Sequence, residues 1–153
     1  MSAYTDLVVS AFGPEAQVED LFDNEYRRSS LQKALAWIKG KKDTLQDIAS
    51  LTQGKKIVSS HYQGLQKVVI NAIKGSEGRC EDFDASFRPR TRHNKRRWIG
   101  IASAFRKGID LPPVELIKVG EVYVVRDGHH RISVAKAFGA ESVLASVTVW
   151  DVD

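Results

Sequence analysis

The chain has 153 residues, of which 42% are hydrophobic and one, Cys80, is a cysteine, and its formal net charge is +4. A chain of this size can fold without disulfides or a structural metal, and a single cysteine excludes an intramolecular disulfide framework. No apolar run approaches the roughly 18 residues of a membrane-spanning helix, and residues 1–12 contain no Lys or Arg that would open a signal peptide. We therefore expect a cytoplasmic protein that has no membrane partner.

The first third of the sequence is typical of helices. Apolar side chains recur at helical spacing over 15–28, 31–39 and 44–52. Ser29 and Asp43 each precede a glutamine by three residues, which is the pattern of a capped helix start. Gly40 and Gly54 are placed to end the second and third helices. We predict an N-terminal helical segment over 1–56.

The second and third of these helices are close enough in sequence to form a helix-turn-helix. The third, however, offers only Gln46 and Gln53 as base readers, and it carries Asp47. We favour a packing appendage or an oligomer surface, which leaves a homodimer open.

From residue 57 the sequence alternates between strands and helices. Strands are expected at 65–70, 114–118, 122–126 and 143–150, and helices at 92–106 and 132–138. Pro112-Pro113 stops the first of these helices, and Gly120-Glu121 is the turn of a hairpin. This order predicts an α+β domain, or mixed α/β unit, over 57–153, with a small mixed sheet and packed helices.

A basic stretch lies at 88–107. It holds eight Lys and Arg residues and no acid, so the rest of the chain sums to −4. Such a concentrated field favours an anionic partner. One interpretation is a DNA or RNA surface formed by Arg88, Arg90, Arg92, Lys95, Arg96 and Arg97. The alternatives are a solvated helix face and a flank that helps to hold a triphosphate.

A polar turn, Asp127-Gly128-His129-His130-Arg131, follows an apolar strand and opens the next helix. The first N–H groups of a helix lack intrahelical partners and the helix dipole is positive there, so phosphate is favoured. Gly128 lets the backbone approach closely, Arg131 can fork onto two phosphate oxygens, and His130 can donate a further hydrogen bond. The alternatives are an Asp-Gly turn in which Asp127 caps the helix, and histidines that are packed imidazoles.

Two stretches resemble the ParB/sulfiredoxin superfamily. Residues 112–139, which contain the turn, are similar to its core. Residues 69–73 and the following Ser76-Glu77-Gly78-Arg79 resemble its first strand and the polar loop after it. The resemblance covers about 65–150, and it implies the superfamily's small mixed sheet with packed helices.

The branches of this superfamily differ in the turn. Sulfiredoxin-like members carry a reactive cysteine where this chain has His129, so sulfinic acid reduction is not expected. The CTP-binding partition proteins have Gly-Glu-Arg-Arg and a helix-turn-helix domain after it, whereas this chain ends at Asp153. The turn resembles most the free-serine kinases, in which a glutamate after the first strand is the base. The resemblance implies Glu77 or Asp127 as catalytic base or Mg²⁺ ligand, with phosphates held by Arg79, Gly128, His129, His130 and Arg131.

Together these features predict a nucleotide-phosphate-binding protein that hydrolyses a nucleoside triphosphate or transfers a phosphoryl group at the turn. The resemblance implies Mg²⁺ with ATP, ADP or CTP. The histidines and the cysteine lack the spacing of metal ligands, so no metal site made by the protein alone is expected. The alternatives are a DNA- or RNA-binding protein or ParB-like nuclease that uses the basic stretch, and a module that uses the nucleotide only as a switch.

Overall fold

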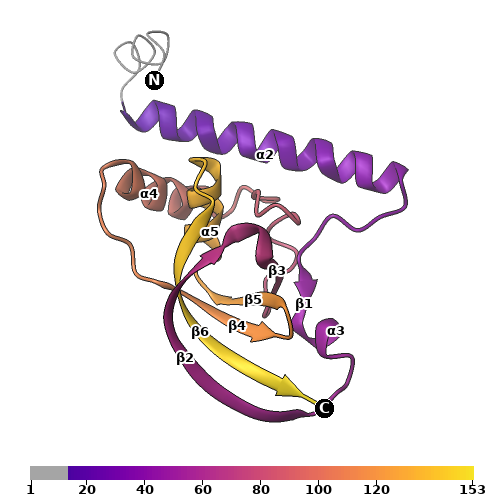
Figure 1. Cartoon of the computed structure of the whole chain (residues 1–153). Coiled ribbons are helices and arrows are strands. Elements are labelled where there is room, and N and C mark those ends of the chain that lie inside the picture. The colour runs from indigo at the N-terminus through magenta and orange to yellow at the C-terminus, as the bar shows by residue number, and fades with distance from the viewer. Residues whose placement is uncertain (1–13) are drawn as a thin grey trace.

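The computed structural model describes residues 14–153 as an α+β fold in which helices pack on a mixed sheet (Figure 1). The strands are β1 Gln46–Asp47, β2 Ile57–Val69, β3 Ile73–Ser76, β4 Val114–Val119, β5 Val122–Asp127 and β6 Ser142–Val152. The helices are α2 Pro14–Ile38, α3 Ile48–Thr52, α4 Lys95–Arg106 and α5 His129–Ala137, with a 3-10 turn, η1 Ile70–Ala72, between β2 and β3. Across the sheet the strand order is β1-β3-β5-β4-β6-β2. The expected α+β class with a small mixed sheet is confirmed.

Strands β3 and β5 lie side by side and end at the same edge of the sheet. They run parallel, with Ser76 opposite Val125, whereas β4 and β5 form the antiparallel hairpin that the sequence predicted. The N–H of Glu77 donates to the carbonyl oxygen of Val125 at 2.9 Å. The loop after β3 and the turn after β5 are therefore neighbours in space, although about 50 residues separate them in the chain.

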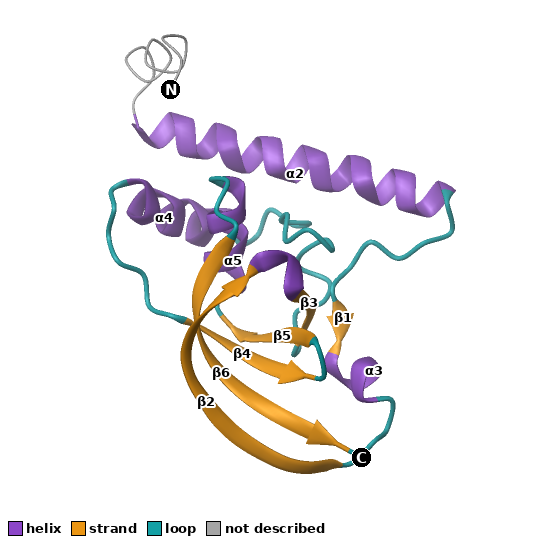
Figure 2. Cartoon of the chain, viewed as in Figure 1, coloured by secondary structure: helices purple, strands orange, loops and turns teal. Residues whose placement is uncertain are grey.

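Helix α5 packs on the sheet, α4 packs on α5, and α2 lies across α4 (Figure 2). Trp98 of α4 is fully buried at the centre of these helices. Its ring meets the ring of Phe22 of α2 edge-on, with 5.5 Å between the centroids. Its indole N–H donates to Ser133 Oγ of α5 at 2.9 Å. Trp98 thus ties the three helices into one layer.

Two of the predicted N-terminal helices are a single helix. The sequence suggested a break at Ser29, but α2 runs through it from Pro14 to Ile38. No glycine or proline lies between residues 15 and 38 to stop the helix. Ser29 is buried on the face that packs on the domain, so it is an interior helix residue and not a cap.

The third predicted helix is shorter than expected and begins later. Asp47, and not Asp43, is its N-cap, and the Asp47 carboxylate accepts from the N–H of Ala49 at 3.2 Å. Before the cap, residues 46–47 pair with β3 as a short strand, and Leu45 is buried in the core. This sheet pairing replaces the first helical turn, so a helix-turn-helix is not formed in the described part of the chain.

Strand β2 is longer than the predicted strand 65–70. It begins at Ile57 and pairs with β6 over most of its length as a curved antiparallel ribbon at the edge of the sheet. Most side chains of the first half of β2 are exposed on both faces, so the sequence there lacks the alternation that marks a half-buried strand.

The predicted division at residue 56 crosses a continuous structure. The short strand β1 belongs to the same sheet as β3, and Val18 and Phe22 of α2 share a core cluster with α4 and α5. The division into a helical segment over 1–56 and a domain over 57–153 stays a prediction. In the described range, 14–153, no helix is both long and apolar enough to cross a membrane.

Candidate functional site

The polar turn forms the amino end of α5, as predicted. Gly128 is the N-cap with φ 105°, and a Cβ at this position would lie 2.6 Å from Cγ1 of Val114. The first helical bond runs from the N–H of Ile132 to the carbonyl of Gly128. The backbone N–H groups of residues 129–131 have no hydrogen-bond partner within residues 14–153. Three adjacent donors at the positive end of the helix dipole are thus left for an anion.

His129 is a packed residue with a defined partner. It is 4% exposed, its ring stacks on Phe83 at 6.0 Å between centroids, and its Nε2 lies 2.6 Å from Ser76 Oγ. Burial, and then the charge of Arg79, lower the pKa of His129 to about 4. At neutral pH this imidazole is uncharged, so it organises the turn and supplies no positive charge to a phosphate.

His130 is equally buried but lacks a hydrogen bond. It is also 4% exposed, and its ring meets Phe83 edge-on at 5.3 Å. No hydrogen bond to its ring is present within the described residues. Burial, followed by the charges of Arg97 and Arg79, lowers the pKa of His130 to about 4. His130 is thus a neutral imidazole that packs on Phe83 and lines a small pocket at the helix terminus, where it is available as a hydrogen-bond donor or acceptor.

Arg131 is held by the protein. One guanidinium nitrogen donates to the backbone oxygens of Pro112 and Pro113 at 2.6 and 2.8 Å, and the other to Asp127 at 2.9 Å. The predicted fork of Arg131 onto a phosphate is therefore not available in this arrangement. The structure gives Arg131 the role of joining the segment before β4 to the turn after β5.

Two other arginines face the terminus of α5. Arg79, from the loop after β3, and Arg97, from α4, line the same small pocket as Gly128 and the two histidines. Their guanidinium groups have neither a hydrogen bond nor an ion pair within residues 14–153. Arg79 was predicted as a phosphate contact. Arg97 was predicted only as part of a nucleic-acid surface, and its position is the main contribution to the site that the sequence did not indicate.

Of the two predicted carboxylates, Asp127 lines this pocket, whereas Glu77 lies on the loop after β3 and lines neither this pocket nor the cavity beside Arg79. Glu77 forms an ion pair with Arg126 at 3.3 Å, and Asp127 forms one with Arg131 at 2.9 Å. Both are partly exposed. No group of three His, Cys, Asp or Glu side chains in the described part of the chain could hold a metal ion. Two separate carboxylates suit Mg²⁺ only when the ion arrives with phosphate oxygens of its own, which is how Mg²⁺ is commonly bound with nucleotides.

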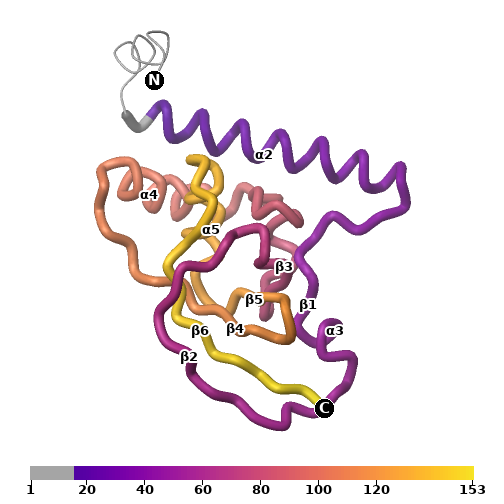
Figure 3. Tube along the Cα trace, viewed as in Figure 1, coloured from indigo at the N-terminus to yellow at the C-terminus, as the bar shows by residue number. Residues whose placement is uncertain are grey.

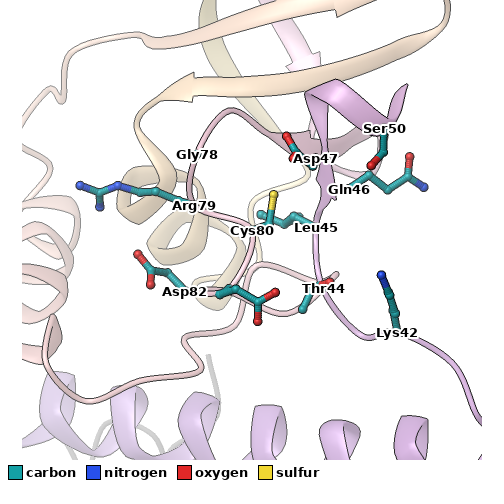
Figure 4. Close-up of a pocket in the computed structure, with 11 residues that line it drawn as sticks. Lys42, Thr44, Leu45, Gln46, Asp47, Ser50, Gly78, Arg79, Cys80 and Asp82 are labelled. Atoms are coloured by element: carbon teal, nitrogen blue, oxygen red, sulfur yellow. The ribbon is translucent and has the colours of Figure 1, made fainter. Parts of the chain in front are cut away.

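A larger cavity of about 690 Å³ adjoins the site. It lies between residues 42–50, which include β1, and the loop 78–82, and Arg79 lines both this cavity and the small pocket (Figure 4). Figure 4 shows the Arg79 side chain extending away from Lys42, on the far side of the loop. Carboxylates of Asp47, Glu81 and Asp82 make the cavity polar, and no aromatic side chain lines it.

Cys80 lies in the wall of this cavity. Burial, together with the carboxylates of Asp47 and Glu81, raises the pKa of its thiol. The thiol is thus protonated at neutral pH and is a poor nucleophile.

Most of the basic stretch is engaged in structural ion pairs. Arg88 pairs with Glu25 and Asp84, and Arg90 with Glu81. Arg92 and Lys95 both approach Asp23 of α2, at 3.9 and 3.1 Å. These four side chains hold α2 and the loop before α4 in place, so the structure does not present the six predicted residues as one free nucleic-acid track. Arg96 and Arg97 are the two that remain exposed without an ion pair in the described range.

Sequence reasoning missed the residues that support the turn. Ser76 binds His129, and Phe83 lies between the two histidines. Asp84, fully buried, accepts from the N–H groups of Ser86 and Arg88, both at 2.9 Å. For Asp84 the sequence did offer a local indication, because Asp side chains commonly accept hydrogen bonds from backbone N–H groups two residues further along a turn. No local signal marked Ser76.

The fold is similar to the crystal structure of sulfiredoxin from Arabidopsis thaliana, with a TM-score of 0.41 and 17% identity over 54% of this chain and 82% of that chain. No protein-family model matches the chain, and no curated protein matches it.

Proposed function

We propose that this protein binds a nucleotide by its phosphates at the amino end of α5, and that it hydrolyses or transfers the terminal phosphoryl group. The observation that carries the proposal is the buried ring of His130. It has no hydrogen-bond partner in the described chain and lines the same pocket as two unpaired arginines and the open end of the helix. A bound phosphate oxygen or hydroxyl group would give this imidazole the hydrogen bond that it lacks in the described chain.

The phosphate would be held by charge and by backbone donors. Arg79 and Arg97 would neutralise it from the loop and from α4, and the free N–H groups of residues 129–131 would donate to its oxygens. Gly128 would hold the turn in the positive-φ conformation that presents these N–H groups. His129 and Arg131 would fix the shape of the turn without touching the ligand.

The predicted chemistry needs a carboxylate near the phosphate. Asp127 lines the pocket, and Glu77 lies on the loop that carries Arg79. Glu77 or Asp127 would accept a proton from the attacking water or hydroxyl group. Each is now paired with an arginine, so either would act only when the ligand draws that arginine away. Mg²⁺ brought in with the nucleotide would neutralise phosphate charge, with Glu77 and Asp127 as its oxygen ligands from the protein.

The adjoining cavity would hold the parts of the nucleotide or of the phosphoryl acceptor that lie beyond the phosphate pocket. Its volume of about 690 Å³ lies within the usual range of small-molecule sites. Its carboxylates suit the hydroxyl or amino groups of a ligand. Arg79 lines both this cavity and the phosphate pocket.

Phosphate release from ATP, CTP and GTP with Mg²⁺ tests the chemistry. We expect turnover that falls by at least tenfold in either Glu77→Gln or Asp127→Asn, whichever residue is the base. Glu121→Gln, in the turn between β4 and β5, is the control and should have no effect. If neither site variant changes the rate, these carboxylates have no catalytic role. If the chain binds a nucleotide but releases no phosphate, the alternative of a module that uses the nucleotide only as a switch is favoured.

The nucleic-acid alternative is supported by the charge of the basic stretch, but four of its six residues are engaged in ion pairs. It stays a prediction, and its direct test is the salt dependence of binding to DNA and RNA.

A further inference from the structure

The C-terminal half of α2 presents large apolar side chains to solvent. Its first half is anchored by Val18 and Phe22, but from residue 30 to residue 41 every residue except Ala36 is exposed. Figure 3 shows this half running past α4 and α5. The exposed fractions are 62% for Leu31, 40% for Leu35, 84% for Trp37 and 73% for Ile38. Single exposed apolar residues are ordinary, whereas four on two turns form a patch that marks an interaction surface.

These side chains form one continuous face. At about 100° per residue, the residues between 31 and 38 that fall on an arc of roughly 160° are Trp37, Ala34, Ile38, Leu31 and Leu35, in that order. Ser30 and Arg27, from the preceding turns, project onto the same arc. Lys33 borders the arc on one side and Lys39 on the other. The arc lies on the side of the helix opposite Phe22 and Ser29, which are buried against the domain. The face therefore points away from the body of the protein.

The same segment is strongly basic. Between residues 27 and 42 there is no acid and there are six basic residues, Arg27, Arg28, Lys33, Lys39, Lys41 and Lys42. An apolar arc with an exposed tryptophan, bordered by lysines, is the pattern of a helix that lies in the surface of a bilayer. Each basic residue adds attraction to anionic headgroups within a Debye length.

We propose that the segment 27–42 docks on an anionic lipid surface, with Leu31, Leu35 and Ile38 in the headgroup region. A second copy of the chain is a poorer occupant, because pairing this segment with itself would set six positive charges against six. A nucleic acid would use the charges but would leave the aliphatic side chains in water. The expectation of no membrane partner came from the lack of a spanning segment, and a helix that lies in the surface is a different mode of binding.

Vesicle flotation of the full chain tests this proposal. We expect the protein to float with vesicles of phosphatidylcholine that contain phosphatidylglycerol, and not with phosphatidylcholine alone, and to be released by high salt. The tryptophan emission should shift to shorter wavelength on binding. Of the three tryptophans, Trp98 is buried and Trp150 is partly buried on β6, whereas Trp37 is 84% exposed on the proposed face. Trp37→Phe should therefore remove most of this shift.

Variants on the face and on a matched exposed site separate docking from misfolding. Lys33→Gln with Lys39→Gln should weaken binding roughly 25-fold. Leu31→Ser should weaken it as well, whereas Leu65→Ser, on the edge strand β2 and similarly exposed at 60%, should not. Absence of flotation with either vesicle overturns the proposal. So does a dimer that is lost in Leu31→Ser, or binding to DNA that requires Lys33 and Lys39 while vesicles are ignored.

Discussion

The hydroxyl of Ser76 lies 2.6 Å from Nε2 of His129, and this contact joins the last residue of β3 to the first residue of α5. The N–H of Arg79 also donates to the same hydroxyl at 3.1 Å. Ser76 thus fixes the loop that carries Arg79 against the turn that carries the free helix donors. This buried hydroxyl group adds a side-chain link to the backbone pairing of β3 with β5, which also holds the two halves of the site together.

Replacing Ser76 with Ala should therefore cost stability and phosphate affinity together. The buried His129 nitrogen would lose its partner, which costs about 1–3 kcal/mol. Urea denaturation of Ser76→Ala measures the first effect, and Ser30→Ala, at an exposed site on α2, is the control. Unchanged stability in Ser76→Ala would show that the contact is not formed in solution.

The two buried histidines predict a particular dependence of stability on pH. Their pKa values are lowered from 6.5 to about 4 in the folded chain, so the unfolded chain binds more protons between these values. The stability they contribute is complete above about pH 6.5 and is lost as the pH falls toward 4, by up to roughly 3 kcal/mol for each histidine.

Denaturation midpoints at pH 7 and pH 5 measure this effect. The double variant His129→Gln/His130→Gln should be less stable at pH 7 and should lose less between the two pH values. Imidazole proton shifts that titrate near pH 6.5 for both residues would contradict the burial described here.

Gly128 cannot be replaced without strain. Its φ of 105° is unfavourable for a residue with a side chain, and Cβ would lie 2.6 Å from Val114 Cγ1. We expect Gly128→Ala to lower the free energy of unfolding by about 1–3 kcal/mol or more. Gly100→Ala, in α4, is the matched control, because a Cβ there meets nothing within 4 Å. It should raise stability by about 0.5–1 kcal/mol, and equal effects of the two changes would refute the account of the turn.

Arg88 separates the structural role of the basic stretch from a nucleic-acid role. Its guanidinium pairs with Glu25 and with the buried Asp84. Arg88→Gln should lower stability by about 1–3 kcal/mol, as measured by thermal melts, whereas Arg96→Gln should leave stability unchanged. The reverse result, with intact stability and a large loss of DNA affinity in Arg88→Gln, would favour the nucleic-acid alternative.

Much of the site could be predicted because its signals are local. An apolar strand, a glycine and a polar helix start are neighbours in sequence, so the turn after Arg126 was placed correctly as the amino end of a helix. Local capping patterns were less dependable, since Ser29 carries the residues of a helix start and yet lies inside α2. Intrinsic preference for a cap is small compared with the burial of Val18 and Phe22 on one continuous helix face.

The remaining features depend on contacts between distant parts of the chain. Arg96 and Arg97 are equivalent in sequence, and only the packing of Trp98 decides that Arg97 faces the helix terminus. Arg131 fits a phosphate motif in the sequence, but in the structure its guanidinium group donates to the carbonyl oxygens of Pro112 and Pro113. The first half of β2 is held by backbone pairing with β6, which leaves no pattern in its side chains.

The most direct test of the central claim is calorimetric titration of the chain with ATP, ADP, CTP and GTP in the presence of Mg²⁺, comparing Arg97→Ala with its neighbour Arg96→Ala. Both variants lose one positive charge from α4, but only Arg97 lines the pocket at the end of α5. We predict that at least one nucleotide binds, that Arg97→Ala weakens it roughly 10-fold or more, and that Arg96→Ala leaves its affinity within about twofold of the unmodified chain. Binding of no nucleotide by the folded chain, or equal losses in the two variants, would contradict a phosphate site at the amino end of α5.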